Sequence, residues 1–106
     1  YYAIEHVSPY TLMGSVYVLE GISVILASSA AASIRSSLNI TNNDGFSYLI
    51  SHGALDIEHV KFFEKTINQI TGEESQDCIV ASAKVFYKLY GDIFRDIYNR
   101  HVEKFI

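Results

Sequence analysis

Three side chains of metal-binding type are spaced at helical intervals near the middle of the chain. His52, Asp56 and His59 stand at positions i, i+4 and i+7, a spacing that places them on one face of a helix. Two imidazoles and one carboxylate are the ligand set of non-haem Fe(II) sites, where open coordination positions remain for oxygen and substrate. The alternative is a surface helix that carries these residues without binding a metal. The spacing predicts a transition-metal site.

A fourth ligand is predicted in an earlier segment. Glu20 is the single charged residue between positions 11 and 34. Removing an unpaired carboxylate from water is very unfavourable, and a metal ion facing it would remove that cost. The alternative is a position at the rim of the fold, or an ion pair with Arg35 or a lysine. Glu20 and the 52–59 cluster together predict that two neighbouring helices bind iron, or manganese, between them.

The elements that carry these ligands are predicted to be helices throughout. The chain has 106 residues, one proline and six glycines, which fits one domain, and no segment alternates as a strand would. The small residues at positions 27–33 indicate close approach of a neighbouring helix. The first expected helix runs from Ser8-Pro9 to about Leu38. A short helix is expected from a cap at Asn42-Asn43-Asp44 through Phe46 to His52, followed by an interruption at Gly53 and a helix from Ala54 to Ile70 that ends in a left-handed cap at Thr71-Gly72. The last expected helix begins at Glu73.

Composition and charge indicate which partners and which cellular compartment to expect. The net charge is −4 and the eight basic residues are dispersed, which argues against a nucleic-acid surface. Residues 11–34 are long enough to span a bilayer, but Glu20 near the middle favours the buried helix of a soluble bundle. The single cysteine excludes an intrachain disulfide, and no signal peptide opens the sequence. We therefore expect a cytoplasmic protein without nucleic-acid or membrane partners.

Two motifs resemble those of a known family. Residues 12–21, with Gly14, Tyr17, Glu20 and Gly21, are similar to the Gly-x-x-Tyr-x-x-Glu-Gly helix of haem-oxygenase-like proteins. Residues 46–63, which include His52-x-x-x-Asp56-x-x-His59, resemble the metal-binding helix of one branch, called iron-containing redox enzymes or haem-oxygenase-like di-iron oxidases. The 32-residue gap from Glu20 to His52 also fits that layout, and the resemblance covers most of residues 9–100.

The resemblance implies a haem-oxygenase-like bundle of seven helices in which two irons activate O2 to oxidise a small organic substrate. C–C cleavage, desaturation and N-oxygenation all occur in the family. Carried over to this sequence, Glu20 would be a carboxylate ligand, and His52, Asp56 and His59 would complete the set from the next helix. Tyr17 would line the substrate pocket or pack in the core.

The sequence departs from the family pattern upstream of Glu20. The family's remaining ligands, a glutamate and a histidine seven positions apart on an earlier helix, have no counterpart there, since Glu5 and His6 are adjacent. The resemblance therefore implies that residues 1–106 form one helical domain of three or four helices, about the C-terminal half of the bundle. Its partner would be a missing N-terminal half or a second copy. A truncated relative that binds one metal ion or none is the alternative.

Three other functions stay open at this point. A metal-free enzyme of the same fold would be similar to the thiaminase-like or pyrroloquinoline-quinone-synthase-like branches. A haem-degrading enzyme is the second, since the Tyr-x-x-Glu-Gly helix resembles that group too. The third is a helical interaction module with a degenerate site. An oxidoreductase is the expectation if the N-terminal half is present.

Overall fold

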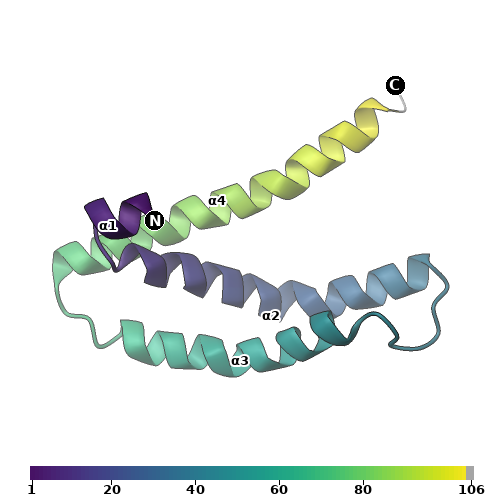
Figure 1. Ribbon diagram of the computed structural model, residues 1–106, viewed down its shortest axis with the longest axis horizontal. Coiled ribbons are helices and arrows are strands. Elements are labelled where there is room, and N and C mark those ends of the chain that lie inside the picture. Colours follow the sequence, from purple (N-terminus) through teal and green to yellow (C-terminus); the bar gives the residue numbers. More distant parts are fainter. Residues whose placement is uncertain (105–106) are drawn as a thin grey trace. The chain divides into compact units, whose positions relative to one another are not determined.

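The chain folds into helices, as a computed structural model that describes residues 1–104 shows (Figure 1). The helices are α1 (Tyr2–His6), α2 (Thr11–Ser37), α3 (Ser47–Ile67) and α4 (Glu73–Glu103), and no strand occurs among these residues. The prediction of an all-α fold with three or four helices is confirmed. Contacts define two compact units: Val16–Ile70, here called the site unit, and Tyr1–Ser15 with the described residues from Thr71 onward, here called the terminal unit.

The site unit is an antiparallel pair made of α3 and the greater part of α2, joined by the loop of residues 38–46 (Figure 1). The two helices approach closely where α2 carries small residues. Ala27 and Ala31 are 6% and 3% exposed, and Gly53 of α3 is buried. A Cβ atom on Gly53 would lie 3.2 Å from the Cβ of Ala27. The predicted close approach is confirmed, and it fixes how the two helices face each other.

Helix α3 corrects the predicted interruption at Gly53. The helix is continuous from Ser47 to Ile67, whereas two separate helices were expected. Glycine lowers helix propensity by about 1 kcal/mol relative to alanine. The helix tolerates this loss because Gly53 is the point at which α3 packs against Ala27 and Ser28 of α2. Packing therefore decides the conformation here, against the local propensity.

The predicted starts of α2 and α3 also need correction. Helix α2 begins at Thr11 rather than at Pro9. The Ser8 hydroxyl accepts a hydrogen bond from the Tyr10 N–H at 3.2 Å, and the Ser8 carbonyl accepts the Thr11 N–H. Ser8 therefore organises a turn before the helix. Residues 42–44 likewise form a turn of their own, in which the Asn42 side chain accepts the Asp44 N–H at 3.1 Å, and α3 begins later without a side-chain cap.

The left-handed cap that was predicted at Thr71-Gly72 is wrong. Gly72 has an extended backbone (φ −71°, ψ 120°) and is the N-cap of α4, which begins at Glu73 as predicted. Left-handed conformations occur instead at Asn39 (φ 55°), just after α2, and at Gly45 (φ 84°), just before α3. Asparagine tolerates this region because its short polar side chain can hydrogen-bond locally. Helix α3 ends at Ile67, three residues earlier than expected.

The terminal unit is held together where the start of α2 crosses α4. A Cβ atom on Gly14 would lie 2.2 Å from the Ile79 carbonyl oxygen and 2.8 Å from the Ala83 nitrogen, so only glycine fits. Next to this crossing, the Ser82 hydroxyl donates a hydrogen bond to the Thr11 carbonyl. Ile79 and Ser82 are buried. The crossing thus depends on backbone-to-backbone proximity.

Much apolar surface remains exposed on these helices. On α4, Leu89, Ile93 and Ile97 are each more than half exposed. Helix α2 is the one described helix that is long and apolar enough to cross a membrane by length and composition, and few residues in that window are buried. The core helix of a soluble protein passes the same test.

Candidate metal centre

A row of paired side chains links α2 to α3 within the site unit. Tyr17 pairs with Glu64 at 2.9 Å, and Glu20 pairs with His59 at 3.1 Å. Further along α2, Ser23 lines one cavity with Asp56, and Ala27 packs on Gly53. The sequence order rises along α2 and falls along α3, as an antiparallel pair requires. The helical spacing of three to four residues thus brings every pair to the same interface.

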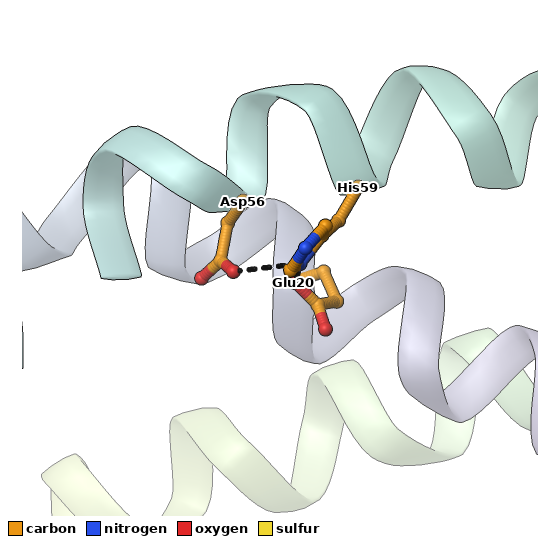
Figure 2. Close-up of side chains that lie close together, drawn as sticks. All are labelled: Glu20, Asp56 and His59. Atoms are coloured by element: carbon orange, nitrogen blue, oxygen red, sulfur yellow. Dashed lines mark hydrogen bonds and ion pairs between the residues drawn. The ribbon is translucent and has the colours of Figure 1, made fainter. Parts of the chain in front are cut away.

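Glu20, Asp56 and His59 meet in the middle of this row, as Figure 2 shows. Each offers one ligand atom, and the three atoms lie within 4.8 Å of one another. The Nδ1 atom of His59 is 3.1 Å from Oε2 of Glu20 and 3.2 Å from Oδ1 of Asp56. Asp56 and His59 project from α3 towards α2, where Glu20 meets them. The predicted juxtaposition of Glu20 with the α3 cluster is therefore present for these three residues.

The three side chains differ in their access to water. The Asp56 side chain is 7% exposed, that of Glu20 is 26% exposed, and that of His59 is 52% exposed. Asp56 is therefore the inner member and His59 the outer one. A site of this kind has a fixed carboxylate at its base and an imidazole that solvent can reach.

Hydrogen bonds keep Asp56 ionised despite its burial. The Ser23 hydroxyl holds the pKa of the Asp56 carboxyl below its ordinary value, and Glu20 and His59 act in the same direction, against the effect of burial. Hydrogen bonds to the charged form of a carboxylate favour that form. Asp56 therefore presents a negative charge in the interior at neutral pH.

His59 gains a proton more readily than an isolated imidazole. Its pKa is raised by the hydrogen bond with Glu20 first, and Asp56 acts in the same direction. The nitrogen that faces both carboxylates can hold either a proton or a metal ion between them. The site can thus act as an acid–base group without a metal, or as a ligand set when a metal displaces that proton.

The donor set fits a divalent transition metal. Ligand atoms at right angles about such an ion, each about 2.1 Å away, lie about 3 Å apart, close to the 3.1 and 3.2 Å seen here. One imidazole and two carboxylates suit iron and manganese better than a soft-ligand metal such as copper(I). They also leave coordination positions open. Two carboxylates neutralise the charge of one divalent ion in this partly buried place.

His52 lies outside the group of three. Its Nδ1 atom is 2.9 Å from the Tyr48 carbonyl oxygen, one turn earlier on α3, and its ring stacks on Tyr48 with the centroids 3.9 Å apart. It shares a cavity of about 330 Å³ with Glu20 and Asp56. The structure thus places His52 beside the cluster rather than within it, and its role as a ligand stays a prediction.

Tyr17 is placed in the row of pairs and not in that cavity. Its hydroxyl donates to Oε1 of Glu64, and this bond is the main cause that raises the pKa of the Tyr17 phenol. The cavity beside Glu20 is instead lined by other residues: Val16, Leu19, Glu20, Ser23, Ala27, Tyr48, Leu49, His52 and Asp56. Tyr17 is therefore a link between helices in this structure.

Sequence reasoning missed two participants, Ser23 and Glu64. Ser23 follows Glu20 by three residues and Glu64 follows His59 by five. The helical spacing from Glu20 could have drawn attention to Ser23, because positions i and i+3 share a face. Glu64 had no such signal, since its partner depends on the alignment of α2 with α3.

The fold and the site together define an all-α protein with a carboxylate–histidine cluster between two antiparallel helices. The family model described as iron-containing redox enzyme matches residues 1–91, and the chain belongs to that family. Neither a curated protein nor a solved structure matches it. The expectation that was drawn from the two motifs is confirmed at the level of the family.

Proposed function

We propose that the protein is a non-haem iron oxidase or oxygenase that uses O2 to oxidise a small organic substrate. The observation that carries the proposal is the convergence of Glu20, Asp56 and His59 within 4.8 Å in a chain whose family is iron-containing. We further propose two irons, with additional ligands from outside this chain's described residues. Manganese is the alternative metal.

Each member of the cluster has a distinct task in this proposal. When bound, iron supplies the redox chemistry by which O2 is activated. Asp56, buried and ionised, anchors the ion at the base of the site. Glu20 supplies the second negative charge from the opposite helix. His59 binds through a nitrogen that must first lose its proton, so metal binding should release a proton and weaken at acidic pH.

His52 is suited to be a further ligand at the same cavity. When the hydrogen on Nδ1 is donated to the Tyr48 carbonyl, the lone pair is left on Nε2. Metal-binding histidines commonly donate their other ring nitrogen to a backbone carbonyl in this way. The stack on Tyr48 also limits rotation of the ring. These features support the predicted quartet Glu20, His52, Asp56 and His59.

The remaining partners follow from the cavity and the exposed surface. The cavity of about 330 Å³ has apolar walls at Val16, Leu19 and Leu49, which suits a small organic substrate and O2. We propose that the exposed apolar faces of α2 and α4 are covered by an N-terminal half of the bundle or by a second copy. In that arrangement α2 is a core helix of a cytoplasmic enzyme, with neither a membrane nor a nucleic acid as partner.

Elemental analysis of metal content tests the proposal. The full-length gene product is loaded anaerobically with Fe(II), freed of excess metal and measured beside His52→Ala, Asp56→Ala and His59→Ala. We expect about two irons per chain in the wild type and a loss in each variant. His6→Ala, which changes a histidine outside the cavity and cluster, is the matched control and should keep its iron. Absence of both iron and manganese from the loaded wild type would refute the proposal.

The same variants separate the alternatives. A metal-free enzyme would lose a metal-independent activity in His59→Ala, because His59 between two carboxylates is also an acid–base group. A haem-degrading enzyme would instead give a Soret band when haem is added. A degenerate interaction module predicts that Glu20→Leu stabilises the fold. Under the iron proposal, Glu20→Leu loses the stabilisation that metal gives the native state, about 2.7 kcal/mol at a hundredfold excess over Kd.

A further inference from the structure

A hydroxyl group on α2 lines the same cavity as the most deeply buried carboxylate of the metal cluster. Ser23 follows Glu20 by three residues on α2, so the two side chains share a face. Ser23 and Asp56 line the same cavity and lie between two interhelical contacts, Glu20 with His59 and Ala27 with Gly53. The Ser23 hydroxyl lowers the pKa of the Asp56 carboxyl, as a donor to the charged form does. Ser23 is therefore next to the site although it belongs to none of the ligand types expected there.

The Asp56 carboxylate needs such a partner for its orientation. The terminal torsion of aspartate is broad and has no sharp staggered minimum, so the carboxylate plane is set by its hydrogen bonds. One oxygen, Oδ1, faces His59 at 3.2 Å. With 7% of the side chain exposed, water has little access to the rest of the group. A fixed donor on α2 is thus well placed to hold the plane of the carboxylate.

Ser23 also differs electrostatically from the other neighbours of Asp56. Glu20 and His59 are ionisable and are themselves proposed ligands of the metal ion. A hydroxyl stabilises the carboxylate without bringing a charge that would compete with a metal ion. It therefore keeps its effect after His59 has lost its proton and a metal has entered.

We propose that Ser23 is a positioning residue that acts through Asp56 and orients this carboxylate for the metal ion. The inference rests on the proposed metal site and adds a residue to it. Partners of ligating carboxylates and histidines commonly change metal affinity by 10- to 100-fold when they are mutated. We expect a change of that size for Ser23, although it does not touch the metal.

Binding of Fe(II) and Co(II) to the full-length protein tests the role of Ser23. Ser23→Ala should raise the Kd for Fe(II) about 10- to 100-fold and shift the visible absorption of the Co(II) form, which reports ligand geometry. Ser23→Thr and Ser23→Val have nearly the same shape and differ in the hydroxyl. The threonine variant should bind as the wild type does, and the valine variant as Ser23→Ala does. Ser29→Ala, at an exposed serine of the same helix, is the matched control and should leave Kd unchanged.

The outcomes distinguish this inference from the proposal beneath it. If the wild type binds metal and the valine and threonine variants have equal Kd and equal Co(II) spectra, the role of Ser23 is refuted while the metal site stands. The role is likewise refuted if Ser29→Ala weakens binding as much as Ser23→Ala does. If the wild type itself binds neither Fe(II) nor Co(II), the proposed function fails, and this inference fails with it.

Discussion

Substitution by alanine should have opposite effects on stability at two glycines of α2. Gly14 and Gly21 are seven residues apart in one helix, so helix propensity alone favours alanine at both positions by up to about 1 kcal/mol. Their surroundings differ. A Cβ atom on Gly14 would lie 2.2 Å from the Ile79 carbonyl oxygen, whereas no described atom lies within 4 Å of one on Gly21. Alanine should therefore destabilise the fold at Gly14, against its helix propensity, and stabilise the fold at Gly21.

The magnitude follows from the size of the overlap. At 2.2 Å the new methyl group is more than 1 Å inside ordinary contact, and it meets backbone atoms of α4 that cannot rotate away. Overpacking of this kind costs about 1–3 kcal/mol, and we take the upper end because the obstacle is backbone. Helix propensity offsets about 1 kcal/mol of this cost. Gly14→Ala should therefore lower the free energy of unfolding by about 2 kcal/mol. Gly21→Ala should gain up to about 1 kcal/mol.

Chemical and thermal denaturation followed by circular dichroism measures both variants. A difference of about 3 kcal/mol between them corresponds to roughly 12–24 °C in Tm for a domain of about 100 residues. Gly14→Ala should be the less stable protein by this margin. Equal stabilisation by the two substitutions would show that α2 does not cross α4 at Gly14, and would refute the packing of the terminal unit.

Two further predictions concern the ionisable groups of the site unit. The pKa of His59 is raised by Glu20 and then by Asp56. In the metal-free protein, protonated His59 therefore stabilises the fold fully below the ordinary histidine pKa of about 6.5. This stabilisation is lost as the pH rises through the higher folded-state pKa. The stability of His59→Gln should lack this decline above about pH 6.5. Identical pH profiles of stability for the two proteins would contradict the contact of His59 with Glu20. The pKa of the Tyr17 phenol is raised, mainly by its bond to Glu64. In a spectrophotometric titration, Tyr17→Phe should therefore remove a tyrosine that ionises above the ordinary pKa of about 10. If the tyrosine that is lost ionises at the ordinary pKa instead, the hydrogen bond between Tyr17 and Glu64 is contradicted.

Several parts of the fold could be predicted from local sequence. The absence of strand patterns sufficed for the all-α class, and the predicted start of the last helix at Glu73 is the observed start of α4. The i, i+4, i+7 spacing predicted a shared helical face for His52, Asp56 and His59, and all three lie in α3, although the break expected at Gly53 would have separated His52 from the other two. Features of this kind depend on residues within a few turns of one another, which is why sequence reasoning reaches them.

Predictions failed where a distant contact overrides a local preference. Gly53 lowers helix propensity, and a break was expected there, yet α3 runs through it because the glycine packs on Ala27 of α2. Gly72 was expected to be left-handed, but the chain is extended there so that α4 can begin. In each case, the sequence near the glycine permits several conformations, and neighbouring elements select one.

For the site, the sequence by itself determined which side chains are of ligand type and that Glu20 is the single charged residue between positions 11 and 34. Only the tertiary structure decided which of them meet. The antiparallel alignment of α2 and α3 brings Glu20 to Asp56 and His59 and places Ser23 and Asp56 in the wall of one cavity. The physical reason is that helical spacing fixes the face on which a residue lies, whereas the packing of one helix on another fixes what that face meets.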